Sequence, residues 1–342
     1  MQPQEHILLK DFTTFRIGGP ARYFVAVKNT EELREAIQFA HSKQLPIFVL
    51  GGGSNVLISD KGFPGLVIKI EIKGIEYKER EGEDVEVIVG AGENWDDAVG
   101  HIVSRGLSGL ENLSLIPGSV GAAPVQNIGA YGAEVKDTIS WVEVFNTETY
   151  TLEQCSKEQC QFDYRDSIFK KPEGKKYVIT RVGFKLSKKP NVNITYKDIS
   201  NYISEHKVED LSIQKIRDIV IEIRTKKLPN LKEYGTAGSF FKNPVVLKEQ
   251  YDELVKKYSG LPGFTGASHG DVKIPAAWIL DTLCNFKGYR DGDAGVYKNQ
   301  ALVLVNFGSA TAEDISSLSE KMIACVKEKT SITLEKEVQI IF

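Results

Sequence analysis

The stretch that most constrains this chain runs over residues 117–132, PGSVGAAPVQNIGAYG. It holds four glycines, three alanines and two prolines, and it carries no formal charge. It cannot form an ordinary amphipathic helix or strand, because neither apolar period is present. Glycine has no Cβ, so backbone N–H groups can approach a bulky ligand closely. A plain surface loop would be more polar, so the composition favours a loop that holds a flat, phosphate-bearing cofactor.

Two further glycine clusters lie upstream. Residues 51–57, GGGSNVL, follow a short apolar strand, where phosphate-binding turns often lie. Residues 90–95 form the other cluster. Neither completes the GxGxxG fingerprint, because Val56 and Trp95 stand where glycine or alanine is needed, and no Gly-Lys-Ser/Thr follows. The dinucleotide fold of the common dehydrogenases is therefore disfavoured, and the three clusters predict one ligand contacted by several loops.

Hydrophobic periodicity predicts an α+β chain. The N-terminal part starts with a β-α-β unit, with Asn29 as helix cap, and a second cap at Asn94 opens another helix. Strands are expected at 21–27, 46–50, 66–72 (half-exposed), 85–89, 139–145, 177–186, 301–306 and 332–342. Helices are expected from 212, over 246–258 and 274–284, and from Thr311. On the terminal strand Glu335 and Glu337 should project from one face, about 7 Å apart.

Length and composition limit the class of protein. A chain of 342 residues, 42% hydrophobic and 26% charged, predicts two or three globular domains. A net charge of −3 argues against a nucleic-acid partner. No apolar run approaches the roughly 20 residues that cross a membrane, and the N-terminus lacks a secretory pattern, so a cytoplasmic protein is expected. Four cysteines without a CxxC pair predict reduced thiols and no structural metal.

An ordered set of short motifs makes the sequence specific. These motifs occupy residues 14–15, 50–57, 90–95, 109–113, 116–121, 126–132, 164–169, 237–244 and 334–338. In this order they resemble the UDP-N-acetylenolpyruvoylglucosamine reductase family, in the type that carries an extra tyrosine loop. The resemblance covers nearly the whole chain; each motif is weak alone, and the set is very specific.

The resemblance implies an α+β architecture with an FAD-binding fold of the vanillyl-alcohol-oxidase (PCMH) type. Its two FAD-binding subdomains would be residues 1–72 and 73–200, and an α+β substrate domain would span 208–330, with the strand 332–342 returning to the active site. FAD would be bound non-covalently, because the 51–57 and 117–132 loops contain no histidine. A monomer without a membrane partner is expected.

The resemblance also implies the reaction. NADPH would reduce the flavin, which would then reduce the enolpyruvyl ether of UDP-N-acetylglucosamine (the 3-O-(1-carboxyvinyl) compound) to UDP-N-acetylmuramate. This step belongs to peptidoglycan precursor synthesis, and so to cell-wall biogenesis, cell shape, the cell cycle and cell division.

Three residues match the family's catalytic positions. Hydride addition at C3 leaves negative charge on C2 and its carboxylate, and fixed donors should stabilise that charge. Arg165 offers a planar cation suited to a carboxylate. Glu337 is expected to act as its protonated acid or through a shared proton, which requires a desolvated carboxyl group. Ser239 matches the general acid that protonates C2.

The remaining predicted contacts fall into two sets. Those expected to hold FAD are Gly51, Gly52, Gly53, Ser54, Asn55, Val56, Leu57, Pro117, Gly118, Ser119, Gly121, Ala122, Gln126, Asn127, Gly129, Ala130, Tyr131 and Gly132. Those expected to hold the nucleotide sugar are Tyr164, Tyr196, Arg224, Lys227, Asn243 and Gln300.

Two alternatives remain open on the sequence. One is an oxidase or dehydrogenase of the same flavin fold that acts on another substrate. The other is a non-catalytic nucleotide-sugar binder, which would have no need of a proton donor such as Ser239. The sequence also departs from many relatives at Gln339, where a basic residue is usual, and the chain stops at Phe342 where relatives often continue.

Overall fold

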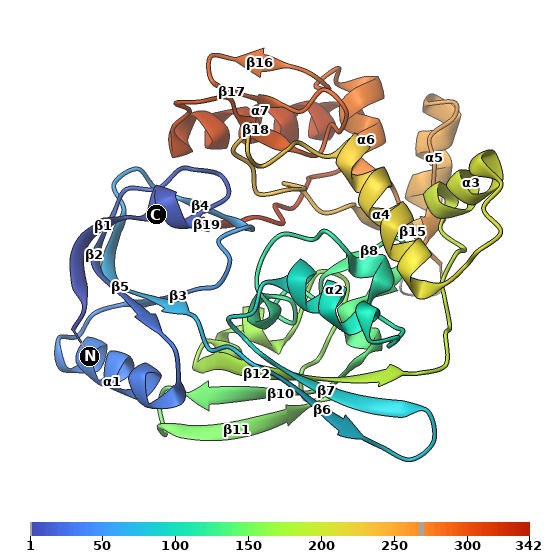
Figure 1. Ribbon diagram of the computed structural model, residues 1–342. Coiled ribbons are helices and arrows are strands. Elements are labelled where there is room, and N and C mark those ends of the chain that lie inside the picture. The colour runs from blue at the N-terminus through green and yellow to red at the C-terminus, as the bar shows by residue number, and fades with distance from the viewer. Residues whose placement is uncertain (1, 267–269) are drawn as a thin grey trace. The chain divides into compact units, whose positions relative to one another are not determined.

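The computed structural model describes residues 2–266 and 270–342 (Figure 1). The chain divides into two compact units. Unit 1 comprises Met1–Ile7, Ala21–Gly52 and Pro64–Thr225, and unit 2 comprises Leu8–Pro20, Gly53–Phe63 and Lys226–Phe342. The chain passes between them inside the first glycine cluster. The three-domain division made from the sequence stays a prediction.

Side-chain caps mark the start of the helices that follow Asn29, Asn94 and Thr311. Asn29 accepts a hydrogen bond from the N–H of Glu32 (2.8 Å), Asn94 accepts one from Asp97 (3.1 Å), and Thr311 forms a reciprocal capping box with Asp314. None of the helices in the described residues is long and apolar enough to span a membrane. The helices are α1 Thr30–Ser42, α2 Trp95–Ser104, α3 Lys197–His206, α4 Ile213–Lys227, α5 Lys248–Lys257, α6 Ala276–Trp278 and α7 Ala312–Thr330.

The strands of residues 2–266 and 270–342 are short on average, and the longest of them belong to unit 1. They are β1 Gln4–Leu8, β2 Pro20–Val27, β3 Ile47–Leu50, β4 Val56–Ile58, β5 Phe63–Ile70, β6 Ile75–Glu79, β7 Asp84–Gly90, β8 Gly129–Ala130, β9 Ala133–Glu134, β10 Ile139–Asn146, β11 Thr151–Ser156, β12 Tyr177–Ser187, β13 Val245–Leu247, β14 Phe264–Thr265, β15 Asp271–Lys273, β16 Arg290–Asp291, β17 Ala294–Val296, β18 Leu304–Asn306 and β19 Gln339–Ile341.

The first sheet of unit 1 has the order β1-β2-β5-β3, with β3 and β5 parallel. The predicted β-α-β unit is confirmed as β2, α1 and β3. The predicted alternation is confirmed over residues 68–72, where Ile68, Ile70 and Ile72 are buried and the lysine and glutamate between them are partly exposed. It does not extend to the start of the predicted strand, because Leu66 and Val67 are also fully buried. β5 lies between two other strands, and consecutive buried residues mean that both of its faces are covered.

The second sheet of unit 1 is antiparallel, with the order β11-β10-β12-β7-β6, and Figure 1 shows α2 beside it. Trp95 of α2 is buried in the same core as Val87 and Val89 of β7 and meets the ring of Phe184 edge-on. Its indole N–H donates to the carbonyl of Leu113 (2.8 Å). This packing fixes the N-terminus of α2 against the segment that leads into the glycine-rich loop.

The core of unit 2 forms around α7, with Ile315, Leu318 and Met322 buried. β4 and β19 pair in parallel, so the end of the chain joins the strand that follows the first glycine cluster. The predicted terminal strand is shorter than expected, because only Gln339–Ile341 forms one. Residues 335–337 instead lie along residues 240–242, through short hydrogen-bonded contacts.

The prediction of four reduced thiols is wrong for one pair. Cys284 and Cys325 form a disulfide with 6.1 Å between their α-carbons, whereas Cys155 and Cys160 are free and buried. The two bonded residues are 41 positions apart, and only the packing of α7 in unit 2 brings them together. Spacing along the sequence could not reveal such a pair.

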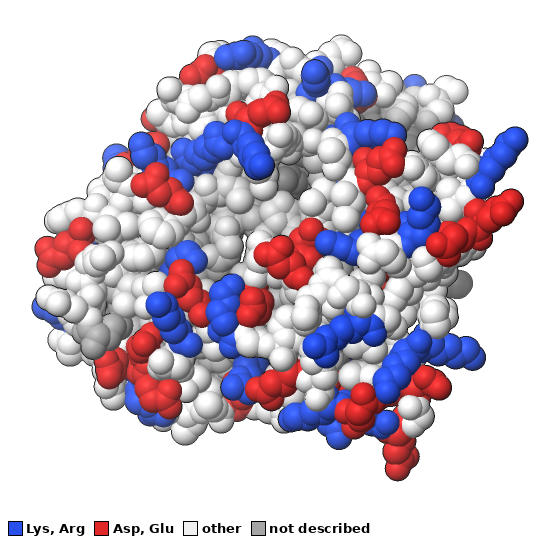
Figure 2. Space-filling model, viewed as in Figure 1, with Lys and Arg blue, Asp and Glu red and all other residues white. Residues whose placement is uncertain are grey.

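Charge is mixed on the surface. On the face shown in Figure 2, lysine and arginine side chains are interspersed with aspartate and glutamate, and no single-sign patch dominates that face.

Candidate functional site

The first and third glycine clusters meet in unit 1. A Cβ atom on Gly52 would lie 2.6 Å from the α-carbon of Gly118, and one on Gly51 would lie 2.5 Å from Oγ of Ser119. Real Cβ atoms do not come this close to other heavy atoms, so at Gly52 the two backbones approach as closely as glycine alone permits, and at Gly51 the Ser119 side chain fills the space. The loops around 51 and 118 therefore form one continuous backbone surface.

The second glycine cluster joins the same surface. Gly121 donates its N–H to the carbonyl of Ala91 (2.8 Å), and Val120 donates to Glu93 (2.9 Å). The N–H of Trp95 in turn donates to the carbonyl of Gly118 (3.1 Å). Residues of all three clusters therefore lie together, as a shared ligand requires, and the contact of these loops with one ligand stays a prediction.

Ser119 supplies a test of whether this surface fits a cofactor. Its side-chain oxygen is buried and has no hydrogen-bond partner among the described residues. A buried hydroxyl without a partner costs free energy, so native proteins rarely leave one. Closely approached backbone and an unsatisfied hydroxyl suit a ligand that offers phosphate oxygens, and the residues present therefore fit FAD.

The second half of the long loop is a small hairpin. β8 and β9 pair across the turn Tyr131-Gly132, whose φ angles of +50° and +81° are those of a two-residue type I′ turn. Asn127 is fully buried, and its amide donates to Glu134 and to the carbonyl of Asp163. That side chain holds the loop together, so a contact of Asn127 with a cofactor would come from its backbone.

The other residues predicted to hold FAD are divided between the two units. Ala122 ends the short 3₁₀ helix of residues 120–122, and Gln126 is partly buried in the following turn. Gly53 adopts φ +64° and accepts the N–H of Thr14 (3.0 Å) within unit 2. The remaining residues of this cluster also belong to unit 2: Ser54 and Asn55 are partly buried, and Val56 and Leu57 are buried in β4.

Arg165 occupies the tip of a four-residue turn. Asp163 and Asp166 close this turn by exchanging two backbone hydrogen bonds (3.1 and 3.2 Å), and Arg165 takes a left-handed φ of +53°. Such strain in a residue other than glycine costs about 1–2 kcal/mol and is common at functional positions. The guanidinium donates to the carbonyl of Gly129 (2.8 Å) and lies 5.4 Å from the ring centre of Tyr164. Arg165 is thus tied to the cofactor-loop hairpin.

Tyr131, Tyr196 and Arg224 form an aromatic and cationic cluster in unit 1. The two rings lie 5.4 Å apart, and the guanidinium lies 6.0 Å from the ring centre of Tyr131. Burial raises the pKa of Tyr131 to about 12, against the opposing effect of Arg224. Burial also raises the pKa of Tyr196 and lowers the pKa of Arg224. The phenols therefore stay neutral hydrogen-bond donors beside a cation.

Ser239 and Glu337 lie on neighbouring extended segments of unit 2. Phe240 links them, because its N–H donates to Leu302 (2.8 Å) while its carbonyl accepts the N–H of Glu337 (2.8 Å). Gly238, at φ +75°, turns the chain just before Ser239. Both candidate side chains are partly exposed, and a hydroxyl and a carboxyl group are thereby held on one small framework.

Of the other predicted substrate residues, Asn243 and Gln300 accept backbone hydrogen bonds within unit 2. The amide oxygen of Asn243 accepts the N–H of Ala276 (2.9 Å), at the start of α6. The amide oxygen of Gln300 accepts the N–H of Leu302 (3.3 Å). Lys227 is the last residue of α4, where a cation is favoured by the helix dipole.

The sequence did not predict that Asn112 and Asn193 fix the turn of the β8–β9 hairpin. Asn112 is buried and donates to the carbonyls of Tyr131 (2.9 Å) and Asn193 (2.8 Å), and Asn193 donates to Gly132 (2.9 Å). These bonds attach the hairpin turn to the segment before Tyr196. Asn112 lies within the motif at residues 109–113, but no local pattern signals its partners 19 and 81 residues away.

Comparison with known proteins places the chain among reductases. The model for the FAD binding domain matches residues 21–155, and that for the UDP-N-acetylenolpyruvoylglucosamine reductase C-terminal domain matches residues 230–341. Proteins named UDP-N-acetylenolpyruvoylglucosamine reductase from Flavobacterium johnsoniae and Chromobacterium violaceum are each 42% identical, covering 100% and 98% of both chains respectively. The crystal structure of the reductase from Thermus caldophilus covers 100% of both chains at 29% identity, with a TM-score of 0.70.

Proposed function

Because the chain belongs to the UDP-N-acetylenolpyruvoylglucosamine reductase family, we propose that it reduces enolpyruvyl-UDP-N-acetylglucosamine to UDP-N-acetylmuramate. It is an FAD-dependent oxidoreductase that uses NADPH, and the reaction supplies peptidoglycan precursor. When bound, FAD supplies the hydride chemistry that no amino-acid side chain provides. The tasks left to the chain are binding, orientation and proton delivery.

Unit 1 holds the cofactor in this proposal. The backbone around Gly52 and Gly118 would lie against the diphosphate, and the Ser119 hydroxyl would gain the partner that it lacks among the described residues. Gly51, Gly121 and the hairpin at 129–132 would complete this surface. Small residues are needed here because a Cβ on Gly51, Gly52 or Gly121 would collide with the neighbouring loops and push this surface apart.

Three side chains would handle the charge and the proton. Arg165 would bind the substrate carboxylate, whose negative charge grows as hydride adds to C3. Glu337 would donate a hydrogen bond to the same developing anion. The Ser239 O–H bond would break and its proton would pass to C2, so that one hydride and one proton saturate the double bond.

The nucleotide sugar would be held by the remaining residues. Tyr196, Tyr164 and Arg224 offer neutral phenols and a cation, which suit a diphosphate. Lys227, Asn243 and Gln300 would hold the uridine and sugar groups in the same way as their family counterparts.

A single observation carries the proposal best. Ser239 and Glu337 lie on adjacent extended segments, joined through the backbone of Phe240. Besides hydride, reduction of the enol ether needs a proton and a hydrogen-bond donor to the developing anion, and these two residues would supply them. A plain binder of nucleotide sugars would need neither group.

The decisive experiment separates the two half-reactions under anaerobic conditions. NADPH should bleach the flavin of the yellow protein, and enolpyruvyl-UDP-N-acetylglucosamine should then restore its colour. Bleaching without recovery would favour an oxidase or dehydrogenase for another substrate, and a colourless protein that takes up no FAD would refute the proposal.

The same proposal places the enzyme in the cytoplasm, where NADPH and nucleotide sugars are available, and links it to cell shape, the cell cycle and cell division through the supply of wall precursor. It also includes a monomeric state. Light scattering coupled to gel filtration would test this, because a monomer has the 38.0 kDa mass of the chain.

A further inference from the structure

Leu115 has a strained backbone whose two polar groups are both held by charged side chains. It precedes the 117–121 loop by two residues and takes a left-handed φ of +56°. This conformation is unfavourable by roughly tenfold in population for a residue with a Cβ. Its N–H donates to Oδ1 of Asp96 (2.6 Å), and its carbonyl accepts from Nε of Arg224 (3.2 Å). Leu115 is therefore fixed from both sides.

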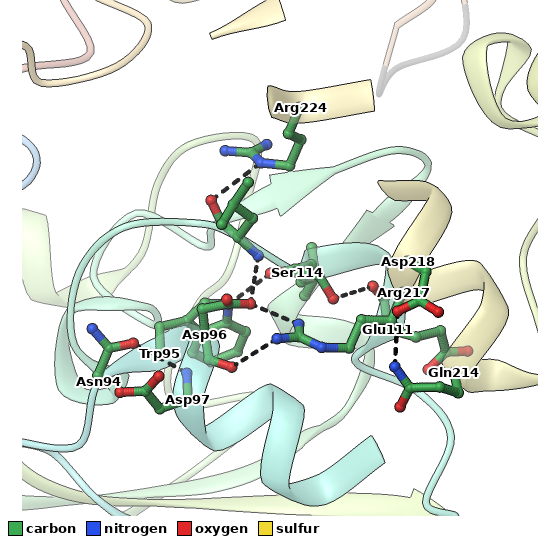
Figure 3. Close-up of polar contacts among 12 residues, drawn as sticks. Asn94, Trp95, Asp96, Asp97, Glu111, Ser114, Gln214, Arg217, Asp218 and Arg224 are labelled. Atoms are coloured by element: carbon green, nitrogen blue, oxygen red, sulfur yellow. Dashed lines mark hydrogen bonds and ion pairs between the residues drawn. The ribbon is translucent and has the colours of Figure 1, made fainter. Parts of the chain in front are cut away.

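Asp96 is itself held in place by Arg217. The Nη1 atom of Arg217 lies 2.6 Å from Oδ1 of Asp96, and its Nη2 atom donates to the Asp96 carbonyl (3.4 Å). Figure 3 shows Arg217 reaching Asp96 from α4, which also carries Arg224. The side chain of Arg217 is 11% exposed and that of Asp96 is 24% exposed, so solvent screens this pair only weakly.

The surroundings leave room for this ion pair. Gly100 lies inside α2, where glycine is an unfavourable helix residue. A Cβ there would lie 3.0 Å from Nη2 of Arg217. Gly100 thus leaves the space that the guanidinium occupies beside the helix, which gives a physical reason for a glycine at this position.

We infer that Asp96 and Arg217 are positioning residues for the cofactor. They hold Leu115 in its left-handed conformation and thereby place the loop that carries Gly118 and Ser119. Neither residue needs to touch FAD, because the effect passes through the backbone of Leu115. The inference rests on the proposed function only in taking the 117–121 loop to hold FAD.

Loss of this positioning should change the affinity for FAD. Without Asp96, Leu115 would leave its left-handed backbone conformation. The conformation of the 117–121 loop that binds FAD would then be populated by only a minor fraction of the protein. The apparent Kd rises in inverse proportion to the competent fraction. A tenfold loss of that fraction, which is the left-handed penalty of one residue, raises the Kd for FAD about tenfold.

The test uses the full-length holoenzyme in equilibrium dialysis against a dilution series of FAD. Asp96→Ala should raise the Kd about tenfold. Asp97→Ala is the matched control, since Asp97 is the next residue in the first turn of α2 and is exposed. It removes the same charge from the helix N-terminus and should change the Kd less than about twofold.

A second variant distinguishes positioning from general damage. Glycine adopts positive φ at little cost, so Leu115→Gly should remove the need for Asp96. In the Leu115→Gly background, Asp96→Ala should change the Kd less than about threefold. Arg217→Gln alone should raise the Kd several-fold, because Asp96 loses the group that orients it.

Other results would overturn the inference. An Asp96→Ala protein that melts cooperatively and binds FAD as tightly as the wild type would do so. An equal loss of affinity in both Leu115 backgrounds would also do so, because Asp96 would then act by another route. A wild-type protein that binds no FAD would instead refute the proposed function.

Discussion

Gly52 and Gly118 are so close that a Cβ atom on Gly52 would lie 2.6 Å from the α-carbon of Gly118. The obstacle is backbone, which cannot rotate away as a flexible side chain could. We expect Gly52→Ala to separate the two loops and to raise the Kd for FAD at least tenfold, about 1.4 kcal/mol. Equilibrium dialysis of the flavin would measure this change.

Gly308→Ala is the control for that substitution. A Cβ on Gly308 would meet Oδ2 of Asp293 at 3.4 Å, which is ordinary contact. The Kd for FAD should stay within about twofold of the wild-type value. If Gly52→Ala bound FAD equally well, the close approach would have no part in holding the cofactor.

Ser239→Ala should separate the two half-reactions. Reduction of the flavin by NADPH needs no proton from this hydroxyl, so its rate should change less than about twofold, whereas reduction of the substrate should fall by about 10²–10⁴. Anaerobic stopped-flow absorbance measures both rates. Ser309→Ala, at an exposed serine of unit 2, should alter neither. Equal losses in both half-reactions would refute the role assigned to Ser239.

Replacing Glu337 by glutamine should cost less activity than replacing it by alanine. Glutamine can still donate a hydrogen bond to the developing anion, so Glu337→Gln should retain about tenfold more kcat than Glu337→Ala. Glu335→Ala serves as the control, because Glu335 is exposed and pairs with Lys242. Steady-state kinetics with saturating NADPH would compare the three. If the glutamine and alanine variants lost activity equally, hydrogen-bond donation by Glu337 would be ruled out.

Local sequence signals predicted the elements that local hydrogen bonds define. Asn29, Asn94 and Thr311 cap α1, α2 and α7 as expected, because each cap is satisfied within three residues. The sequence also indicated the glycine clusters as ligand-binding loops, because an uncharged run of small residues fits neither an amphipathic helix or strand nor an ordinary polar surface loop.

The features that failed depend on partners far along the chain. The burial of consecutive residues 66–68 in β5 depends on what packs against both faces of the sheet, and the Cys284–Cys325 bond follows from packing in unit 2. The Asp96–Arg217 pair joins residues 121 positions apart. Neither carboxylate nor guanidinium gives a periodic signal, so only the fold identifies them as partners.

Tyr131 should make stability depend on pH above 10. Its pKa rises from 10.0 to about 12 in the folded protein through burial, so the folded state favours the protonated phenol. This stabilisation is complete below pH 10 and is lost as pH rises from 10 to 12.

Tyr131→Phe isolates this effect, because phenylalanine does not ionise. Between pH 9 and pH 11 the free energy of unfolding of the wild type should fall by about 1 kcal/mol relative to the variant. Urea unfolding at the two pH values would measure it. A difference between the two proteins that stays constant with pH would contradict the raised pKa.

The Cys284–Cys325 bond should stabilise the protein in an oxidising buffer. It closes a loop of 41 residues, and a crosslink of this length is worth about 2–4 kcal/mol because it restricts the unfolded chain. Dithiothreitol should therefore lower the Tm of the wild type but leave a Cys284→Ser, Cys325→Ser double variant unchanged. Differential scanning calorimetry with and without the reductant would compare the two proteins. A wild-type Tm that does not respond, in protein shown by thiol titration to be fully reduced, would mean that the bond contributes nothing to stability.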